Sequence, residues 1–261
     1  MAQPAAQVAA IPALAWLRIG RRVTAMVTLL IACVPLYYAC RILGTRNPWP
    51  RRFLGGIARI AGVSIRVSGE RSRGGEFLLV NHVSWIDIPA IAAASGTAFV
   101  AHDGLAAMPL LHWLCAMNDT VFVARHDRAS IRRQIEQVRE AICDTGSLAI
   151  FPEGTTSDGT GLLPFKSSLL SALVPIPAGI VVRPVVLDYG PESPGIAWIG
   201  TEPGLDNFKR ILARKRPIVL NVRFLPILSG EALTNRKTIA AAAQAAILQG
   251  LQRNAGQSFS D

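Results

Sequence analysis

Seven short apolar segments with the composition of β-strands recur along the chain, and helical patterns separate several of them. The clearest helical pattern covers residues 130–144, where Ile131, Ile135 and Val138 share one face and charged residues occupy the other. Strands that alternate with helices predict an α/β fold in which a mixed, mostly parallel sheet is flanked by helices. The seven segments are residues 64–67, 77–80, 97–101, 120–124, 147–151, 181–187 and 218–224, and an Ala-rich helix is expected at 238–253.

Polar residues follow three of these strand segments directly. His82 comes after the second segment, Arg125 after the fourth and Glu153 after the fifth. Sites on such sheets form at the carboxyl ends of the strands. The sequence therefore predicts that these three side chains converge at one edge of the sheet.

His82 and Asp87 stand five residues apart, where a strand gives way to a helical pattern. A histidine titrates near neutrality and can take a proton from an alcohol, and a carboxylate partner fixes its tautomer and stabilises the imidazolium. With Asp87 in the first helical turn, both side chains can point to one side. The pair is equally compatible with a loop histidine beside an aspartate that stabilises a helix N-terminus.

An uncharged run covers residues 23–40, with arginines on both flanks. Its length is borderline for a membrane-spanning helix, which needs about 20 apolar residues, and Pro35 is expected to kink it. The flanking arginines favour neither orientation. We expect a monotopic or re-entrant anchor in preference to a full span, with residues 1–46 as tail and anchor and 47–261 as the catalytic domain.

Residues 51–60 form an amphipathic pattern just beyond the helix-breaking stretch 47–50. Phe53, Leu54, Ile57 and Ile60 recur at helical spacing, and three arginines accompany them. Such a helix can lie on anionic headgroups, or it can pack on the domain.

The charge balance is strongly basic, with 27 Lys and Arg against 17 Asp and Glu, a net charge of +10. This balance suits an anionic membrane, an acidic carrier protein or a phosphorylated cofactor. With 51% hydrophobic residues and no nucleic-acid recognition motif, a membrane surface is favoured over nucleic acid. The four cysteines and four histidines show no metal-ligand spacing, so no metal is expected.

Four sequence blocks together carry a family resemblance. They are N-H-x-x-x-x-D at residues 81–87, an apolar strand that ends at Arg125, F-P-E-G-T at 151–155, and an apolar strand with proline at 182–186. In this order they resemble the glycerolipid acyltransferase family, whose best-known members are the 1-acylglycerol-3-phosphate acyltransferases. The resemblance covers roughly residues 50–225.

The resemblance implies a role for each block residue. His82 resembles the general base and Asp87 its orienting partner. Arg125 resembles the clamp for the acceptor headgroup, with an ordinary surface arginine as the alternative. The third block is implied to bind the acceptor, although a strand-ending turn explains its composition as well. In the third block the implied substrate-binding residues are Glu153, Gly154 and Thr155. Lys166, which follows the block, is implied to bind substrate as well, although taken alone it would also suit an exposed surface position.

The implied activity is transfer of a fatty acyl chain from an acyl carrier protein or coenzyme A thioester to the free hydroxyl of a lysolipid. The first acceptor to expect is 1-acylglycerol-3-phosphate, which would give phosphatidic acid, at the cytoplasmic face of the inner membrane. No cofactor beyond the thioester is expected. No G-x-S-x-G motif is present, so a serine nucleophile is not expected.

One departure bears on the acceptor. The family commonly has Arg then Ser after Glu-Gly-Thr, whereas this chain has Thr156 and Ser157. The extended pattern F-P-E-G-T-T-S-D-G also looks like the branch that includes lyso-ornithine lipid acyltransferases. A rival of another class is a non-catalytic lipid-binding protein on the same fold, which would need no histidine beside a carboxylate.

Overall fold

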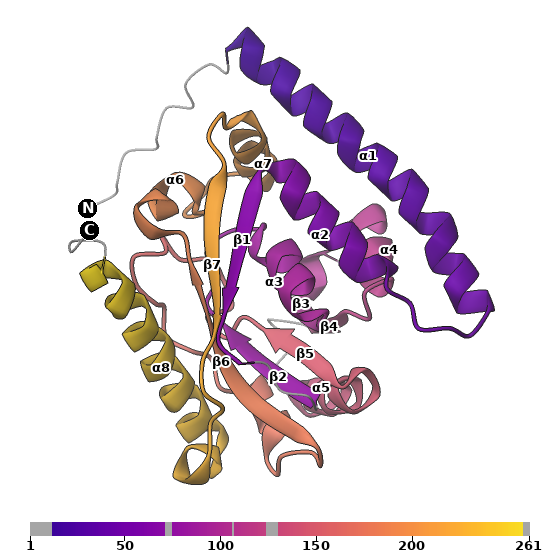
Figure 1. The fold of residues 1–261 in the computed structure, drawn as a ribbon. Helices are drawn as coiled ribbons and strands as arrows, with labels where there is room; N and C mark the ends of the chain where they lie inside the picture. The colour runs from indigo at the N-terminus through magenta and orange to yellow at the C-terminus, as the bar shows by residue number, and fades with distance from the viewer. Residues whose placement is uncertain (1–11, 71–74, 106, 124–129, 258–261) are drawn as a thin grey trace.

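A seven-stranded sheet organises the structure, a computed structural model that describes residues 12–70, 75–105, 107–123 and 130–257 (Figure 1). The strand order is β1-β7-β6-β2-β5-β3-β4. β6, β2, β5, β3 and β4 run parallel, while β1 and β7 run parallel to each other and opposite to the rest. The strands are β1 Val63–Ser68, β2 Gly75–Val80, β3 Ala98–His102, β4 Val121–Val123, β5 Ser147–Ile150, β6 Ile180–Asp188 and β7 Ile218–Phe224.

All seven predicted strands are present, and the mixed, mostly parallel sheet is confirmed. Side chains of β2 alternate between two buried layers, with Leu78 and Val80 on one face and Phe77 and Leu79 on the other. A central strand covered on both faces must be apolar throughout, which explains why this segment reads as a continuous hydrophobic run.

Helices cover both faces of the sheet (Figure 1). The layer beside Leu78 contains α2, α3 and α7, and the layer beside Phe77 contains α5, α8 and a short 3-10 segment. The predicted helices at 130–144 and 238–253 are confirmed as α5 and α8. The helices are α2 Trp49–Ala61, α3 Asp87–Ser95, α4 Pro109–Ala116, α5 Ile131–Thr145, α6 Ser193–Ile196, α7 Gly204–Ala213 and α8 Arg236–Gln257.

Helix α1 spans Ala13–Ile42 and lies along the outside of the domain (Figure 1). By length and composition its 30 residues could cross a membrane. It begins ten residues before the uncharged run and continues through Pro35. One face is buried along its length, and the opposite face exposes large apolar side chains. The buried residues are Ala15, Ile19, Met26, Cys33 and Tyr37.

Two arginines of α1 bind the C-terminal end of α7, a contact that the sequence pattern did not indicate. Arg22 Nη1 donates to the carbonyl of Leu212 at 2.9 Å, and Arg18 donates to that of Ala213. The last carbonyls of a helix lack intrahelical partners and carry partial negative charge, so two guanidinium groups stabilise this end. The division of the chain at residues 46 and 47 stays a prediction.

Helix α2 packs between α1 and α3, which agrees with the packing alternative for residues 51–60. Leu54, Ile57 and Ile60 lie against the core layer of α3 and α7. A Cβ atom at Gly56 would lie 2.4 Å from Leu29 of α1, so the glycine permits the close approach of the two helices. The arginines of α2 remain exposed.

Candidate active site

The loop after β2 is tied to the neighbouring strand by Asn81. Its side-chain amide donates to the carbonyl of Leu187 at 2.9 Å, and its carbonyl oxygen accepts from the Leu187 amide at 2.7 Å. Asn81 thus continues the ladder between β2 and β6 with side-chain groups after β2 itself has ended. His82 consequently leaves the sheet from a rigid position.

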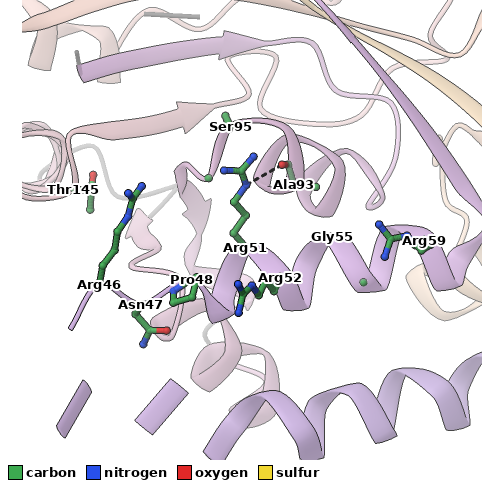
Figure 2. Close-up of a pocket in the computed structure, with 12 residues that line it drawn as sticks. Arg46, Asn47, Pro48, Arg51, Arg52, Gly55, Arg59, Ala93, Ser95 and Thr145 are labelled. Atoms are coloured by element: carbon green, nitrogen blue, oxygen red, sulfur yellow. Dashed lines mark hydrogen bonds between the residues drawn. The ribbon is translucent and has the colours of Figure 1, made fainter. Parts of the chain in front are cut away.

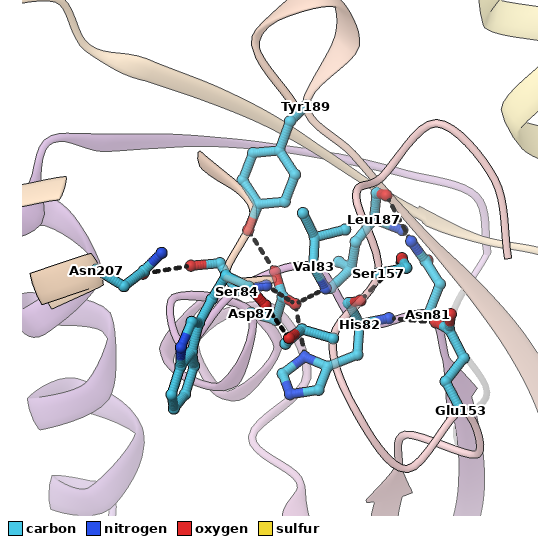
Figure 3. Close-up of polar contacts among 12 residues, drawn as sticks. Asn81, His82, Val83, Ser84, Asp87, Glu153, Ser157, Leu187, Tyr189 and Asn207 are labelled. Atoms are coloured by element: carbon cyan, nitrogen blue, oxygen red, sulfur yellow. Dashed lines mark hydrogen bonds and ion pairs between the residues drawn. The ribbon is translucent and has the colours of Figure 1, made fainter. Parts of the chain in front are cut away.

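His82 and Asp87 form a direct pair (Figure 3). The Nδ1 atom of His82 lies 2.8 Å from Oδ2 of Asp87, which begins α3. The Asp87 side chain is fully buried, whereas that of His82 is 17% exposed. Because Nδ1 is held by the carboxylate, Nε2 is the ring nitrogen left for a substrate.

Asp87 also accepts three further hydrogen bonds. The backbone amides of Val83 and Ser84 donate to Oδ2 at 2.6 and 2.9 Å, and the Tyr189 hydroxyl donates to Oδ1. One carboxylate therefore orders the histidine loop and orients the imidazole ring, while the role of His82 as a base stays a prediction.

Tyr189 remains a donor to Asp87 because of its surroundings. Complete burial, and next the negative charge of Asp87, raise the pKa of Tyr189 well above its usual value. The hydroxyl therefore keeps its proton across the physiological range. Tyr189 follows the carboxyl end of β6, so three parallel strands contribute to this edge.

The ring and backbone of His82 are held from further directions. Phe151 stacks on the imidazole, with ring centroids 4.1 Å apart and an interplanar angle of 21°. The backbone amide and hydroxyl of Ser157 both donate to the His82 carbonyl, at 2.7 and 3.1 Å. These contacts leave the ring one orientation from which to act on a substrate.

Glu153, in the loop after β5, joins two loops through its carboxylate. Its Oε1 accepts from the His82 amide and its Oε2 from the Leu163 amide, both at 2.8 Å. The residue is 1% exposed, and burial raises the pKa of its carboxyl group against the opposing effect of these hydrogen bonds. In this structure its contacts are therefore with the backbone of the site.

Gly154 and Lys166 meet beside Glu153. Gly154 has φ +71°, and a Cβ atom there would lie 2.7 Å from Nζ of Lys166, so the ammonium group lies over the glycine. The Lys166 amide donates to the Pro152 carbonyl at 2.8 Å. Lys166 and Thr155 are both exposed at this rim.

Arg125 lies outside the described residues, so its predicted convergence with His82 stays a prediction. Strand β4, which precedes it, is present at Val121–Val123. The structure does bring together His82, Asp87 and Glu153, with Gly154 and Lys166 at the rim. Within the described ranges, no three His, Cys, Asp or Glu side chains are grouped so that they could hold a metal ion.

Three residues of the site, Asn81, Ser157 and Tyr189, were given no role by the sequence analysis. Asn81 has a usable signal, since an amide between an apolar strand and His82 must find buried partners. Ser157 and Tyr189 have none, because they are 75 and 102 residues from their partners along the chain. Only the tertiary structure connects them to the site.

Comparisons with known proteins agree with the motifs. The acyltransferase family profile matches residues 64–188. A lyso-ornithine lipid O-acyltransferase of Brucella abortus is 32% identical over 243 residues, which are 86% of this chain and 90% of that protein. A 1-acyl-sn-glycerol-3-phosphate acyltransferase of Neisseria gonorrhoeae is 37% identical over 123 residues, 46% of each chain.

A solved structure shares the fold. It is the 1-acyl-sn-glycerophosphate acyltransferase of Thermotoga maritima, with a TM-score of 0.57 and 18% identity over 90% of this chain and 97% of that one. The family resemblance predicted from the four blocks is confirmed, and with it an acyltransferase enzyme of lipid biosynthesis. The chain belongs to the acyltransferase family that acts on lysolipids.

Proposed function

We propose that the protein transfers a fatty acyl chain from an acyl thioester to the free hydroxyl of a lysolipid, with His82 as general base. The observation that carries this proposal is the 2.8 Å contact between His82 Nδ1 and the buried carboxylate of Asp87. Such a carboxylate stabilises the imidazolium that forms when the base takes a proton.

The chemical step needs no covalent enzyme intermediate. Nε2 of His82 takes the proton of the acceptor hydroxyl as its oxygen forms a bond to the thioester carbonyl carbon. The carbon–sulfur bond then breaks, and the thiolate leaves with the proton that His82 releases. No group of the enzyme is consumed.

The acceptor we propose first is a lyso-ornithine lipid. The Brucella relative, a lyso-ornithine lipid O-acyltransferase, aligns over 86% of this chain. The Neisseria relative, a 1-acyl-sn-glycerol-3-phosphate acyltransferase, aligns over 46%. Thr156 stands where an arginine is common in the family, and its hydroxyl donates to the Trp198 carbonyl. A guanidinium for a phosphate headgroup is therefore missing at this position.

The second candidate acceptor is 1-acylglycerol-3-phosphate. The Neisseria relative with that specificity in its name shares 37% identity over its aligned part, which is higher than the 32% of the Brucella relative. Lys166, whose ammonium group lies over Gly154, could meet a phosphate as well as a carboxylate. Under both proposals Arg125, Glu153, Gly154, Thr155 and Lys166 form the acceptor side of the site.

The donor is proposed to be acyl carrier protein or acyl coenzyme A. The net charge of +10 attracts an acidic carrier protein and a phosphorylated nucleotide alike. We place the enzyme on the cytoplasmic face of the inner membrane, where both donors occur. The apolar exposed face of α1 supports membrane association.

A panel of acceptors tests the proposal. The purified full chain is incubated with acyl carrier protein or coenzyme A carrying a labelled acyl group, and with lyso-ornithine lipid or 1-acylglycerol-3-phosphate. We expect label in the O-acylated ornithine lipid at the higher kcat/KM. Preferred transfer to 1-acylglycerol-3-phosphate would establish the second candidate, and no transfer to any lysolipid would overturn the catalytic proposal.

A further inference from the structure

Four arginines line a cavity of about 900 Å³ that runs along α2 (Figure 2). Arg51, Arg52 and Arg59 come from α2, and Arg46 comes from the preceding loop. Ser95 and Gly96 at the end of α3 form another wall with Thr145 at the end of α5. Figure 2 shows the guanidinium group of Arg46 directed toward Thr145.

Within the described part of the chain, no acidic residue lines this cavity. Among the residues that the structure describes, no salt bridge joins any of the four arginines to a carboxylate. Two of them are nevertheless held in place, because Arg51 Nε donates to the Ala93 carbonyl at 3.0 Å and Arg52 lies 4.9 Å over the ring of Trp49. The cavity thus gathers positive charge that no described carboxylate neutralises through a direct ion pair.

The cavity is separate from the proposed active site. Thr145 and Gly96 lie two residues before β5 and β3, whereas His82 follows the carboxyl end of β2. Glu76 of β2 pairs with Ser147 at the start of β5, and His82 lies six residues beyond Glu76. At about 3.3 Å per residue, roughly 20 Å of sheet separates His82 from the wall formed by Thr145 and Gly96. The residues that line the cavity include none of His82, Asp87, Glu153, Gly154 and Lys166.

The C-terminal end of α1 places the cavity beside an exposed apolar surface. Asn47, which lines the cavity, donates to the Tyr37 carbonyl of α1 at 3.1 Å. Ile42 and Leu43, at the same end of α1, are 84% and 73% exposed. Apolar side chains next to a group of guanidiniums match the boundary between acyl chains and headgroups in a bilayer.

α4 extends this apolar surface. Its residue Trp113 donates from Nε1 to the Tyr38 hydroxyl of α1 at 3.1 Å, and Leu110 is 59% exposed. Within α4 no side chain is fully buried. The apolar surface therefore continues from the end of α1 onto a second helix.

We propose that this arginine cavity binds the phosphate group of an anionic membrane phospholipid, at a site distinct from the one where acyl transfer occurs. Guanidinium groups pair with phosphate oxygens through parallel hydrogen bonds, which favours phosphate as the ligand. The neighbouring apolar residues favour a lipid as its source over a soluble phosphate. The proposal rests on the membrane association included in the proposed function, and not on His82 or the acceptor.

Vesicle binding tests the proposal with a matched pair of variants. Arg46→Gln with Arg59→Gln removes two exposed cavity arginines. Arg132→Gln with Arg133→Gln removes two exposed arginines of α5, on the other face of the sheet. Binding of each full chain to phosphatidylcholine vesicles, with and without phosphatidylglycerol, is measured by flotation, and circular dichroism checks folding.

We expect the cavity variant to bind phosphatidylglycerol vesicles about tenfold more weakly than wild type, and the α5 variant within about twofold of wild type. Binding to phosphatidylcholine alone should be equal in all three. Equal losses in both variants would mean a diffuse charge effect and would overturn the site. A wild type that binds no vesicle of either kind would instead refute membrane association itself.

A second measurement separates the lipid from soluble phosphates. Inorganic phosphate and coenzyme A are titrated calorimetrically into the detergent-solubilised wild type and cavity variant. We expect no binding that depends on Arg46 and Arg59. Coenzyme A binding that the cavity variant loses, with unchanged vesicle binding, would assign the cavity to the soluble donor and overturn the lipid proposal.

Discussion

At the scale of single residues, His82 is constrained at the edge and one face of its ring and at its backbone. Asp87 holds Nδ1, Phe151 covers one face, and Glu153 and Ser157 bind the backbone amide and carbonyl. A base held in one orientation loses little entropy when the acceptor hydroxyl arrives. The cost of this arrangement is a fully buried carboxylate, which four hydrogen-bond donors offset.

His82→Ala should reduce acyl transfer by about 10² to 10⁴-fold, because a positioned base contributes that factor. Initial rates with a fixed thioester donor and saturating lysolipid measure the effect. His112→Ala is the matched control, since His112 is exposed on α4 and stacks on Phe122 away from the pair. A His82→Ala rate above about a tenth of wild type would argue against the base assignment.

Tyr189→Phe should shift the acidic limb of the kcat/KM profile to higher pH. Without the Tyr189 hydrogen bond, the carboxylate of Asp87 bears more negative charge and stabilises the imidazolium of His82 more strongly. At a given pH, a larger fraction of the enzyme then already carries the proton on His82 and cannot accept one from the acceptor hydroxyl. A full pH profile of both proteins measures the shift. A lower rate with an unmoved limb would show that Tyr189 serves packing alone.

At the scale of elements, two loops act as one unit. The loop after β2 and the loop after β5 exchange hydrogen bonds through Glu153 and Ser157, and the Trp198 amide donates to the Val83 carbonyl at 2.9 Å. Neighbouring parallel strands bring their carboxyl ends to the same edge, so segments about 70 residues apart in sequence become adjacent. The site depends on their joint order.

Glu153→Gln should destabilise the protein by about 1 to 3 kcal/mol, since an amide replaces one of the two oxygens that accept from buried backbone amides. Denaturant unfolding in detergent measures the loss, with the exposed α5 residue change Glu140→Gln as the control. An equal free energy of unfolding for wild type and Glu153→Gln would show that the carboxylate does not hold the loops.

The pH dependence of that difference has a definite sign. Burial raises the pKa of Glu153 in the folded protein above its ordinary value of 4.5. The titration of Glu153 therefore adds a contribution to the free energy of unfolding of the wild type that is complete below the unfolded pKa and declines as pH rises through the folded pKa, whereas glutamine does not titrate. The difference in free energy of unfolding between wild type and variant should shrink with rising pH across that window, and a growing difference would contradict the shift.

At the scale of the whole molecule, α1 is part of the folded body as well as a candidate membrane contact. Its buried face runs from Ala15 to Tyr37, and Arg18 and Arg22 attach it to α7. Lifting the helix into a perpendicular span would expose this face and leave the final carbonyls of α7 without those partners. The arrangement favours a monotopic helix that lies flat on the bilayer.

Cysteine labelling tests the monotopic arrangement. Pro12→Cys and Thr45→Cys mark exposed positions on either side of α1, and exposed Cys143 of α5 reports the side of the catalytic domain. Intact spheroplasts are treated with a membrane-impermeant maleimide, and peptide mass spectrometry reads each site. We expect all three sites to react only after permeabilisation. Labelling of either end from outside while Cys143 stays protected would establish a span.

The sequence by itself determined the class of fold, the strands and the central pair. The periodicity of apolar residues follows from which face of a strand or helix is buried, so β2 and α5 could be predicted from the local pattern. The contact between His82 and Asp87 could be predicted too, because a separation of five residues across a strand-helix turn allows the two side chains few relative positions. The confirmed family followed from these local blocks.

Only the tertiary structure decided what surrounds that pair. Tyr189 and Leu163 reach the site from distant segments, and the Glu153 carboxylate accepts from backbone amides of two loops. Four arginines gather around a cavity along α2. A local sequence pattern predicts which face of a helix or strand is buried, but it does not predict which distant segment will cover that face. That pairing is set by the strand order and by the packing of helices on the sheet, so it emerges only when the chain has folded.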